Sequence, residues 1–84
     1  MTRYLGKRTV DKDGTVRWYN EKHELHREDG PAIEYVNGDK FWYMNGKLHN
    51  SDGPDIIYGN GEEHWYEHGN FIRSEGSNPW TYKR

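Results

Sequence analysis

The sequence contains no cysteine among its 84 residues. Without thiols the chain has no disulfide framework, no cysteine-ligated zinc and no thiol nucleophile. No apolar run approaches the roughly 20 residues that a membrane-spanning helix requires, and residues 1–10 lack the apolar segment of a signal peptide. These absences predict a cytoplasmic protein that does not enter a membrane.

The sequence is also poor in apolar residues. Hydrophobic residues make up 31% of the chain and charged residues another 31%, which places the composition near the border of disorder. Aromatic residues, at 15%, argue for a folded protein because disordered segments contain few of them. A chain of this length holds one domain, so we expect a single domain over 1–84 with a thin aromatic core.

A strong excess of either charge sign is missing as well, since the net charge is −2. Nucleic-acid binders normally carry a marked basic excess, so nucleic acid is a disfavoured partner. The charges are nevertheless unevenly spread: residues 1–17 carry five basic and two acidic groups, whereas residues 50–76 carry one basic and six acidic groups. This polarity suits a protein partner or a second copy of the chain. Random asymmetry of a solvated surface is the alternative.

Three stretches of the chain align with one another. Each contains Asp-Gly or Asn-Gly, then Trp-Tyr, then Asp-Gly or Glu-Gly. The tryptophans at positions 18, 42 and 65 are spaced 24 and 23 residues apart, and the first unit holds one extra residue around positions 21–23. The alignment predicts an N-terminal cap strand, three repeat units and a C-terminal cap or tail, at 1–12, 13–36, 37–59, 60–76 and 77–84.

Turn dipeptides divide each unit into hairpins. Asn-Gly at 37–38, 45–46 and 60–61 predicts type I′ turns, in which both central residues have positive φ, and Asp13-Gly14 and His68-Gly69 occupy equivalent places. We therefore expect an all-β fold, an antiparallel meander of tandem β-hairpin repeats in an elongated, curled sheet. The expected strands are 3–10, 15–20, 24–28, 32–36, 39–44, 47–50, 55–58, 62–67 and 70–74.

Side-chain alternation along these strands predicts two different faces. One face would carry Trp18, Trp42 and Trp65, with Leu25, Leu48 and Phe71 packed near them. The other face would carry Tyr19, Tyr43 and Tyr66.

The repeat resembles a known family. Residues 37–54 read Asn-Gly-x-x-x-Trp-Tyr-x-Asn-Gly-x-Leu-His-x-x-Asp-Gly-Pro, which resembles a variant of the MORN repeat. Residues 25–32, Leu-His-Arg-Glu-Asp-Gly-Pro-Ala, are similar to small hydrophilic repeat proteins of bacteria and their phages. The likeness covers 13–76, although Asp-Gly-Pro replaces the usual Gly-x-Gly and the third unit lacks both His and Pro. It implies a stacked array of β-hairpins with an interaction role and no catalytic residues.

The histidines give little indication of metal or acid–base chemistry. His26 and His49 occupy the same repeat position, which Ile72 fills in the third unit, so we interpret it as a packing position. His64 and His68 could ligate zinc with a neighbouring glutamate, but His68 stands at a predicted turn. We expect no metal site and no cofactor.

The carboxylates at Asp29, Asp52 and Glu75 recur once in each unit. Each precedes glycine, which is typical of turns rather than of a catalytic acid–base pair. The chain also lacks a phosphate-binding loop, a nucleophile elbow and a zinc-protease motif. We therefore expect no enzyme activity.

Positions that break the repeat are the best candidates for binding, because positions that recur are needed by every unit. The predicted partner-binding residues are His23, Arg27, Tyr43, Glu62, Glu63, Tyr66, Glu67 and Trp80. We expect a non-enzymatic protein-binding module, by resemblance a small phage-encoded inhibitor or modulator of a host defence protein in the host cytoplasm. Two alternatives stay open: a binder that stacks a nucleotide or short nucleic acid on aromatic rings, and a structural adaptor. Open strand edges and the thin core further predict a homodimer.

Overall fold

The computed structural model describes residues 6–76, and within that range the chain forms strands and turns without any helix. The described part therefore holds no helix that could cross a membrane. The strands are β1 (Lys7–Val10), β2 (Val16–Tyr19), β3 (Ile33–Glu34), β4 (Lys40–Phe41), β5 (Tyr43–Met44), β6 (Lys47–Leu48), β7 (Ile56–Ile57), β8 (Glu63–Glu67) and β9 (Asn70–Glu75). The predicted tail at 77–84, with Trp80, lies outside the described residues.

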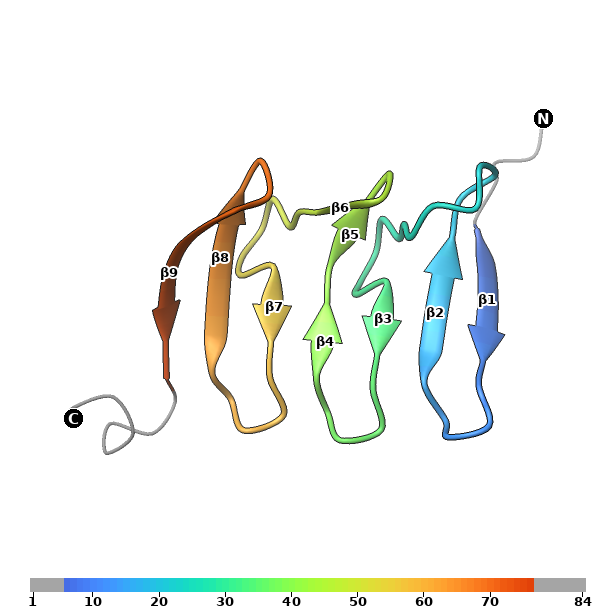
Figure 1. Cartoon of the computed structure of the whole chain (residues 1–84), viewed down its shortest axis with the longest axis horizontal. Helices are drawn as coiled ribbons and strands as arrows, with labels where there is room; N and C mark the ends of the chain where they lie inside the picture. The colour runs from blue at the N-terminus through green and yellow to red at the C-terminus, as the bar shows by residue number, and fades with distance from the viewer. Residues whose placement is uncertain (1–5, 77–84) are drawn as a thin grey trace.

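Seven of the nine strands form one open, antiparallel sheet (Figure 1). Its order is β1-β2-β3-β4-β7-β8-β9, and β5 and β6 pair separately above it. The molecule measures 51 × 30 × 18 Å with a radius of gyration of 14.0 Å, against about 12 Å for a compact domain of this size. The expected elongated all-β fold is confirmed.

The lower hairpins, β1–β2, β3–β4 and β7–β8, share one turn geometry. These turns span residues 11–15, 35–39 and 58–62. In each five-residue segment the N–H of residue 1 donates to the carbonyl of residue 5, and the N–H of residue 4 donates to the carbonyl of residue 1. Only the fourth residue of each turn, a glycine, has positive φ, between 90° and 99°. These are three-residue loops with a glycine bulge, so the type I′ expectation is wrong for them. In each loop the residue before glycine, Asp or Asn, accepts the N–H two positions on, which fixes the bulge.

The upper turns are of two kinds. Asn45-Gly46 and His68-Gly69 have positive φ at both residues, as type I′ requires, so the expectation is confirmed there. The first unit instead closes through 20–24, with the same backbone hydrogen bonds as the lower loops. His23, with φ of 65°, stands in the left-handed position that glycine fills elsewhere. The extra residue of the first unit therefore changes the turn type.

The backbone at His23 gives a first testable prediction. Left-handed φ costs a residue with a Cβ about 1–2 kcal/mol, and glycine relieves that strain at an entropic cost of about 0.5–1 kcal/mol. We expect His23→Gly to raise the free energy of unfolding by about 0.5 kcal/mol, measured by urea denaturation. Lys22→Gly is the control, because Lys22 has negative φ and its replacement should be destabilising. Equal destabilisation by both changes would contradict strain at His23.

The register assigns side chains to two faces, because directly opposite residues in antiparallel strands share a face. The Trp face carries Arg8, Val16, Trp18, Glu34, Lys40, Ile57, Glu63 and Trp65. The Tyr face carries Lys7, Arg17, Tyr19, Ile33, Phe41, Ile56, His64 and Tyr66.

The expected position of the leucines is wrong. Leu25 lies opposite Tyr19 and Leu48 opposite Tyr43, so both belong to the Tyr face rather than to the Trp face. Phe71, opposite Tyr66, follows the same pattern. The cause is turn length: a two-residue turn at 45–46 pairs 44 with 47, and therefore 43 with 48.

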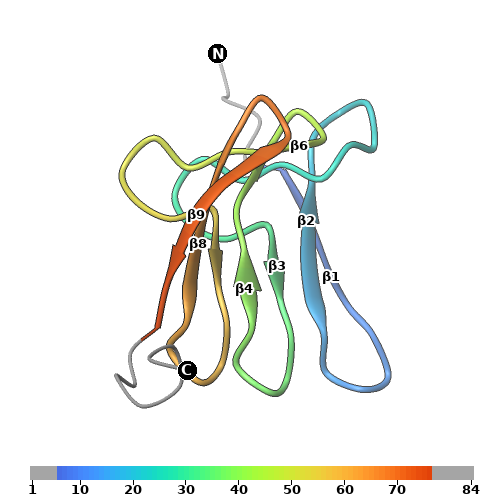
Figure 2. The same ribbon diagram turned by 60° about the vertical axis from the view of Figure 1, so that its left-hand side comes forward.

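Two expected strands also differ. Residues 24–28 form no strand and make a single bridge, between Tyr19 and Leu25. The expected strand 39–44 is divided at Trp42. The Trp42 N–H donates to the backbone carbonyl of Asp55, next to the lower sheet, and the Trp42 carbonyl accepts the N–H of His49, next to the upper hairpin. Trp42 thus marks the place where the second unit passes from the lower sheet to its upper hairpin. Figure 2 shows β6 of this hairpin above β3 and β4.

Within the described residues the sheet ends at β9, the second strand of the third unit. β3 pairs with β2 within the first unit and β7 pairs with β4 within the second, and neighbouring units join through β3–β4 and β7–β8. In the third unit β9 takes the equivalent place beside β8. Its ladder has a bulge at Trp65/Tyr66, and the Tyr66 N–H donates instead to the buried carboxylate of Asp55.

Candidate functional site

The tip of the β5–β6 hairpin is hydrogen-bonded to the first unit. The Gly46 N–H donates to the Leu25 carbonyl at 2.8 Å, and the Asn45 N–H donates to Nδ1 of His26 at 2.9 Å. Since Nδ1 accepts a hydrogen bond, the proton of the neutral ring belongs on Nε2, which lies 3.4 Å from a carboxylate oxygen of Glu28. His26 therefore links the first two units through hydrogen bonds, which the packing interpretation did not anticipate. His49, at the same repeat position, is exposed.

Asn20 organises the longer loop of the first unit. Its Oδ1 accepts the N–H groups of Lys22 and Glu24 at 2.8 and 3.0 Å. Its Nδ2 donates to the Glu24 carboxylate at 2.9 Å and to Oδ1 of Asn45 at 3.2 Å. The equivalent residue is Met44 in the second unit, so this arrangement is specific to the first. Sequence analysis missed both asparagines, although the extra residue pointed to this loop.

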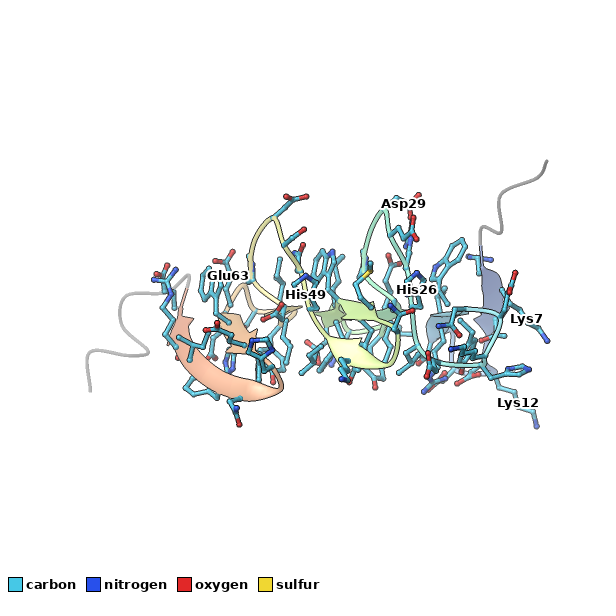
Figure 3. The ribbon with its side chains drawn as sticks, turned by 90° about the horizontal axis from the view of Figure 1, so that it is seen from above. Lys7, Lys12, His26, Asp29, His49 and Glu63 are labelled. Carbon is cyan, nitrogen blue, oxygen red and sulfur yellow. The ribbon has the colours of Figure 1, made fainter. Side chains whose placement is uncertain are left out.

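A groove of about 980 Å³ opens between these elements on the Trp face. Trp18 and Met44 supply its apolar surface, and its walls come from 20–24, from 26–29 and from the hairpin tip at 44–47. Figure 3 shows His26 and Asp29 on this part of the molecule. The lining holds four carboxylates, at Glu21, Glu24, Glu28 and Asp29, against two ammonium groups, at Lys22 and Lys47. Among the lining residues acidic groups therefore outnumber basic ones, with Asp29 paired to Arg27 beside the groove.

Arg27 covers the tryptophan beside the groove. Its guanidinium lies 4.5 Å from the ring centroid of Trp18 and donates to Asp29 at 2.8 Å, to the Pro31 carbonyl at 3.2 Å and to Glu34 at 3.4 Å. These contacts hold Arg27 within its own unit. Its role in partner binding stays a prediction.

The third unit repeats this stack. Arg73 lies 4.1 Å from the ring centroid of Trp65 and donates to Glu75 at 2.6 Å. In the second unit Asn50 takes the arginine position and donates to the Pro54 carbonyl at 2.9 Å, as Arg27 does to Pro31. The residue at this position therefore ties down the loop or strand that follows the upper turn.

A row of aromatic rings crosses the Tyr face. It comprises Tyr35, Phe41, Tyr58, His64, Phe71 and Tyr66, with successive ring centroids 4.9–6.1 Å apart and mostly edge-to-face. Burial raises the pKa of Tyr43, and nearby Tyr35 and Tyr66 raise it further. Burial likewise raises the pKa of Tyr58, with Tyr66, Asp39 and Glu62 contributing. Phe41, Tyr58, His64 and Tyr66 of this row are half-buried, whereas Phe71 on the edge strand β9 is 54% exposed.

The structure divides the predicted partner-binding residues between several places. Tyr43 and Tyr66 lie on the Tyr face, and Glu62 lies near them with its carboxylate 2.9 Å from Nε2 of His64. Glu63 lies on the Trp face opposite Glu75, and Glu67 is exposed at the upper end of β8. His23 is exposed in the loop beside the groove, with its ring 6.2 Å from that of Tyr19. Glu62, Glu63 and Glu67 therefore do not form one acidic patch.

Within residues 6–76, no three histidine, aspartate or glutamate side chains converge on a point where a metal ion could sit. His64 pairs with Glu62, and His68 is exposed in the type I′ turn. The arrangement at 62–68 is thus a hydrogen-bonded His–Glu pair next to a turn.

Comparison with known proteins leaves the geometry as the basis for function. No protein-family model, curated protein or solved structure matches the chain. The resemblance of residues 13–76 to MORN repeats stays a prediction.

Proposed function

We propose that the chain is a non-enzymatic protein-binding module that holds a segment of its partner in the groove beside Trp18. The observation that carries this proposal is the origin of the groove walls. The loop 20–24 departs from the repeat in length, sequence and turn type, and it is bonded to the neighbouring hairpin through Asn20 and Asn45. A scaffold built from recurring residues has no need of such a departure.

The groove suits a basic segment. Four carboxylates against two ammonium groups attract positive charge, and Trp18 and Met44 can pack against the aliphatic stem of a lysine or arginine. Exposed charges of this kind mainly govern the association rate and its salt dependence. Binding should therefore weaken as salt is raised.

The MORN resemblance supports a narrower proposal. By that likeness the chain would be phage-encoded, act in the host cytoplasm and inhibit or modulate a host defence protein. The nucleotide-stacking alternative is less well supported, because Arg27 and Arg73 already occupy one ring face of Trp18 and of Trp65. An adaptor would bind a partner in the same groove without changing its activity.

Capture from a bacterial lysate tests this function with a matched control taken from the chain itself. In the loop-replacement variant, residues 20–24 are exchanged for Met-Asn-Gly-Lys, the sequence that closes the second unit at 44–47. The variant should fold, because the same turn already joins Tyr43 to Leu48, the equivalents of Tyr19 and Leu25 in the second unit. We expect the native chain to retain one protein in stoichiometric amount, and the variant to lose it without a change in circular dichroism.

Two results would contradict the proposal. Equal capture by both proteins would place binding outside the groove. Quenching of tryptophan fluorescence by mononucleotides or cyclic nucleotides, with no captured protein, would favour the stacking alternative.

A further inference from the structure

The Tyr face has no second layer within the described chain. Sheets normally bury one apolar face against another element, yet within 6–76 the buried aliphatic residues are few: Ala32, Ile33 and Ile56, with Pro31 beside the first two. Tyr35, at one end of the aromatic row, is 37% exposed, and Phe71, on the edge strand β9, is 54% exposed. The row is therefore continuous but incompletely covered.

We propose that a second copy of the chain covers this face, so that two sheets pack Tyr face to Tyr face about a two-fold axis parallel to the strands. This inference goes beyond partner binding, because the groove opens on the opposite face. It also specifies the surface of the expected homodimer, the Tyr face, and the relative orientation of the two copies.

Charge complementarity selects this axis. Lys12, in the first lower turn, lies at one end of the sheet, and Asp39 and Glu62 belong to the second and third lower turns. Figure 3 shows Lys7 and Lys12 at the opposite end of the molecule from Glu63. A two-fold axis parallel to the strands reverses the long direction of the sheet, so Lys12 approaches Glu62 of the second copy. An axis along the sheet would instead place the two basic ends together.

The face is large enough for a stable contact. The molecule measures 51 × 30 Å along its two longer axes, in the plane of the sheet, whereas a specific interface needs about 800 Å² from each partner. Aromatic side chains dominate the binding energy of such contacts. The aromatic row provides them along the middle of the face.

Light scattering and sedimentation equilibrium test the dimer. We expect the native chain to have twice its mass of 10.1 kDa at micromolar concentration. Phe71→Lys should raise the dimer dissociation constant at least about tenfold, since the new charge falls in an aromatic contact. Val10→Lys is the matched control: Val10 is 56% exposed but lies on the Trp face, so its replacement should leave the mass unchanged. A monomeric native protein, or equal weakening by both variants, would overturn the proposal.

A charge exchange tests the orientation. Lys12→Glu and Glu62→Lys should each weaken the dimer at low salt, and the double variant should regain native affinity because the pair is restored with reversed signs. A double variant weaker than either single variant would overturn the two-fold axis parallel to the strands.

Discussion

Ile56→Ala should lower the free energy of unfolding by about 2–5 kcal/mol, the range for deleting a buried isoleucine. Ile56 is only 3% exposed, and its neighbours in register on the Tyr face are Phe41 and His64. Few apolar residues of the described chain are buried, so the core has little other packing to offset the cavity. A domain of this size has about 4–13 kcal/mol of stability in total. Urea denaturation followed by circular dichroism measures the loss.

Ile57→Ala is the matched control for this result. Ile57 is the next residue of the same strand, but it lies on the Trp face and is only half-buried. Ile57→Ala removes the same atoms from a more exposed site, so we expect it to lower the free energy of unfolding by less than about half as much as Ile56→Ala. Equal losses at the two positions would contradict a core centred on the Tyr face.

Trp42→Ala should unfold most of the protein, at a cost of about 3–5 kcal/mol. Trp42 stands in the middle unit. Its N–H donates to the backbone carbonyl of Asp55, and its own carbonyl accepts the N–H of His49. Units of a repeat array stabilise their neighbours, so loss of the central tryptophan should loosen both junctions. Loss of the β-sheet dichroism signal and a lower melting temperature would record this.

Trp42→Phe keeps an aromatic ring at the same position and serves as the control. It should fold, with a smaller decrease in melting temperature than Trp42→Ala. A stable Trp42→Ala protein that no longer captures its partner would show instead that the tryptophan binds rather than supports the fold.

The sequence predicted the hairpin array because its signals are local. Glycine-containing dipeptides mark the turns, and the spacing of the tryptophans sets the repeat. Turn type was less accessible, because Asn-Gly forms a bulged three-residue loop at 37–38 and a type I′ turn at 45–46. That difference of one residue decides which face Leu48 occupies.

The candidate groove could be predicted only in part. The extra residue near 21–23 indicated an irregular loop, and alternation would have separated Glu62 from Glu63. The contacts of Asn20 with Asn45 and of His26 with the same hairpin join residues 25 and 19 positions apart. Such contacts depend on how neighbouring units stack, which no local pattern specifies.

We propose that the two faces have different functions: the groove on the Trp face would bind a partner protein, and the Tyr face would bind a second copy of the chain. Sedimentation velocity of the chain, alone and mixed with its captured partner, tests both in one measurement. The loop-replacement variant should keep the dimer and lose the partner, whereas Phe71→Lys should lose the dimer and keep the partner. Loss of both interactions in either folded variant would contradict the claim.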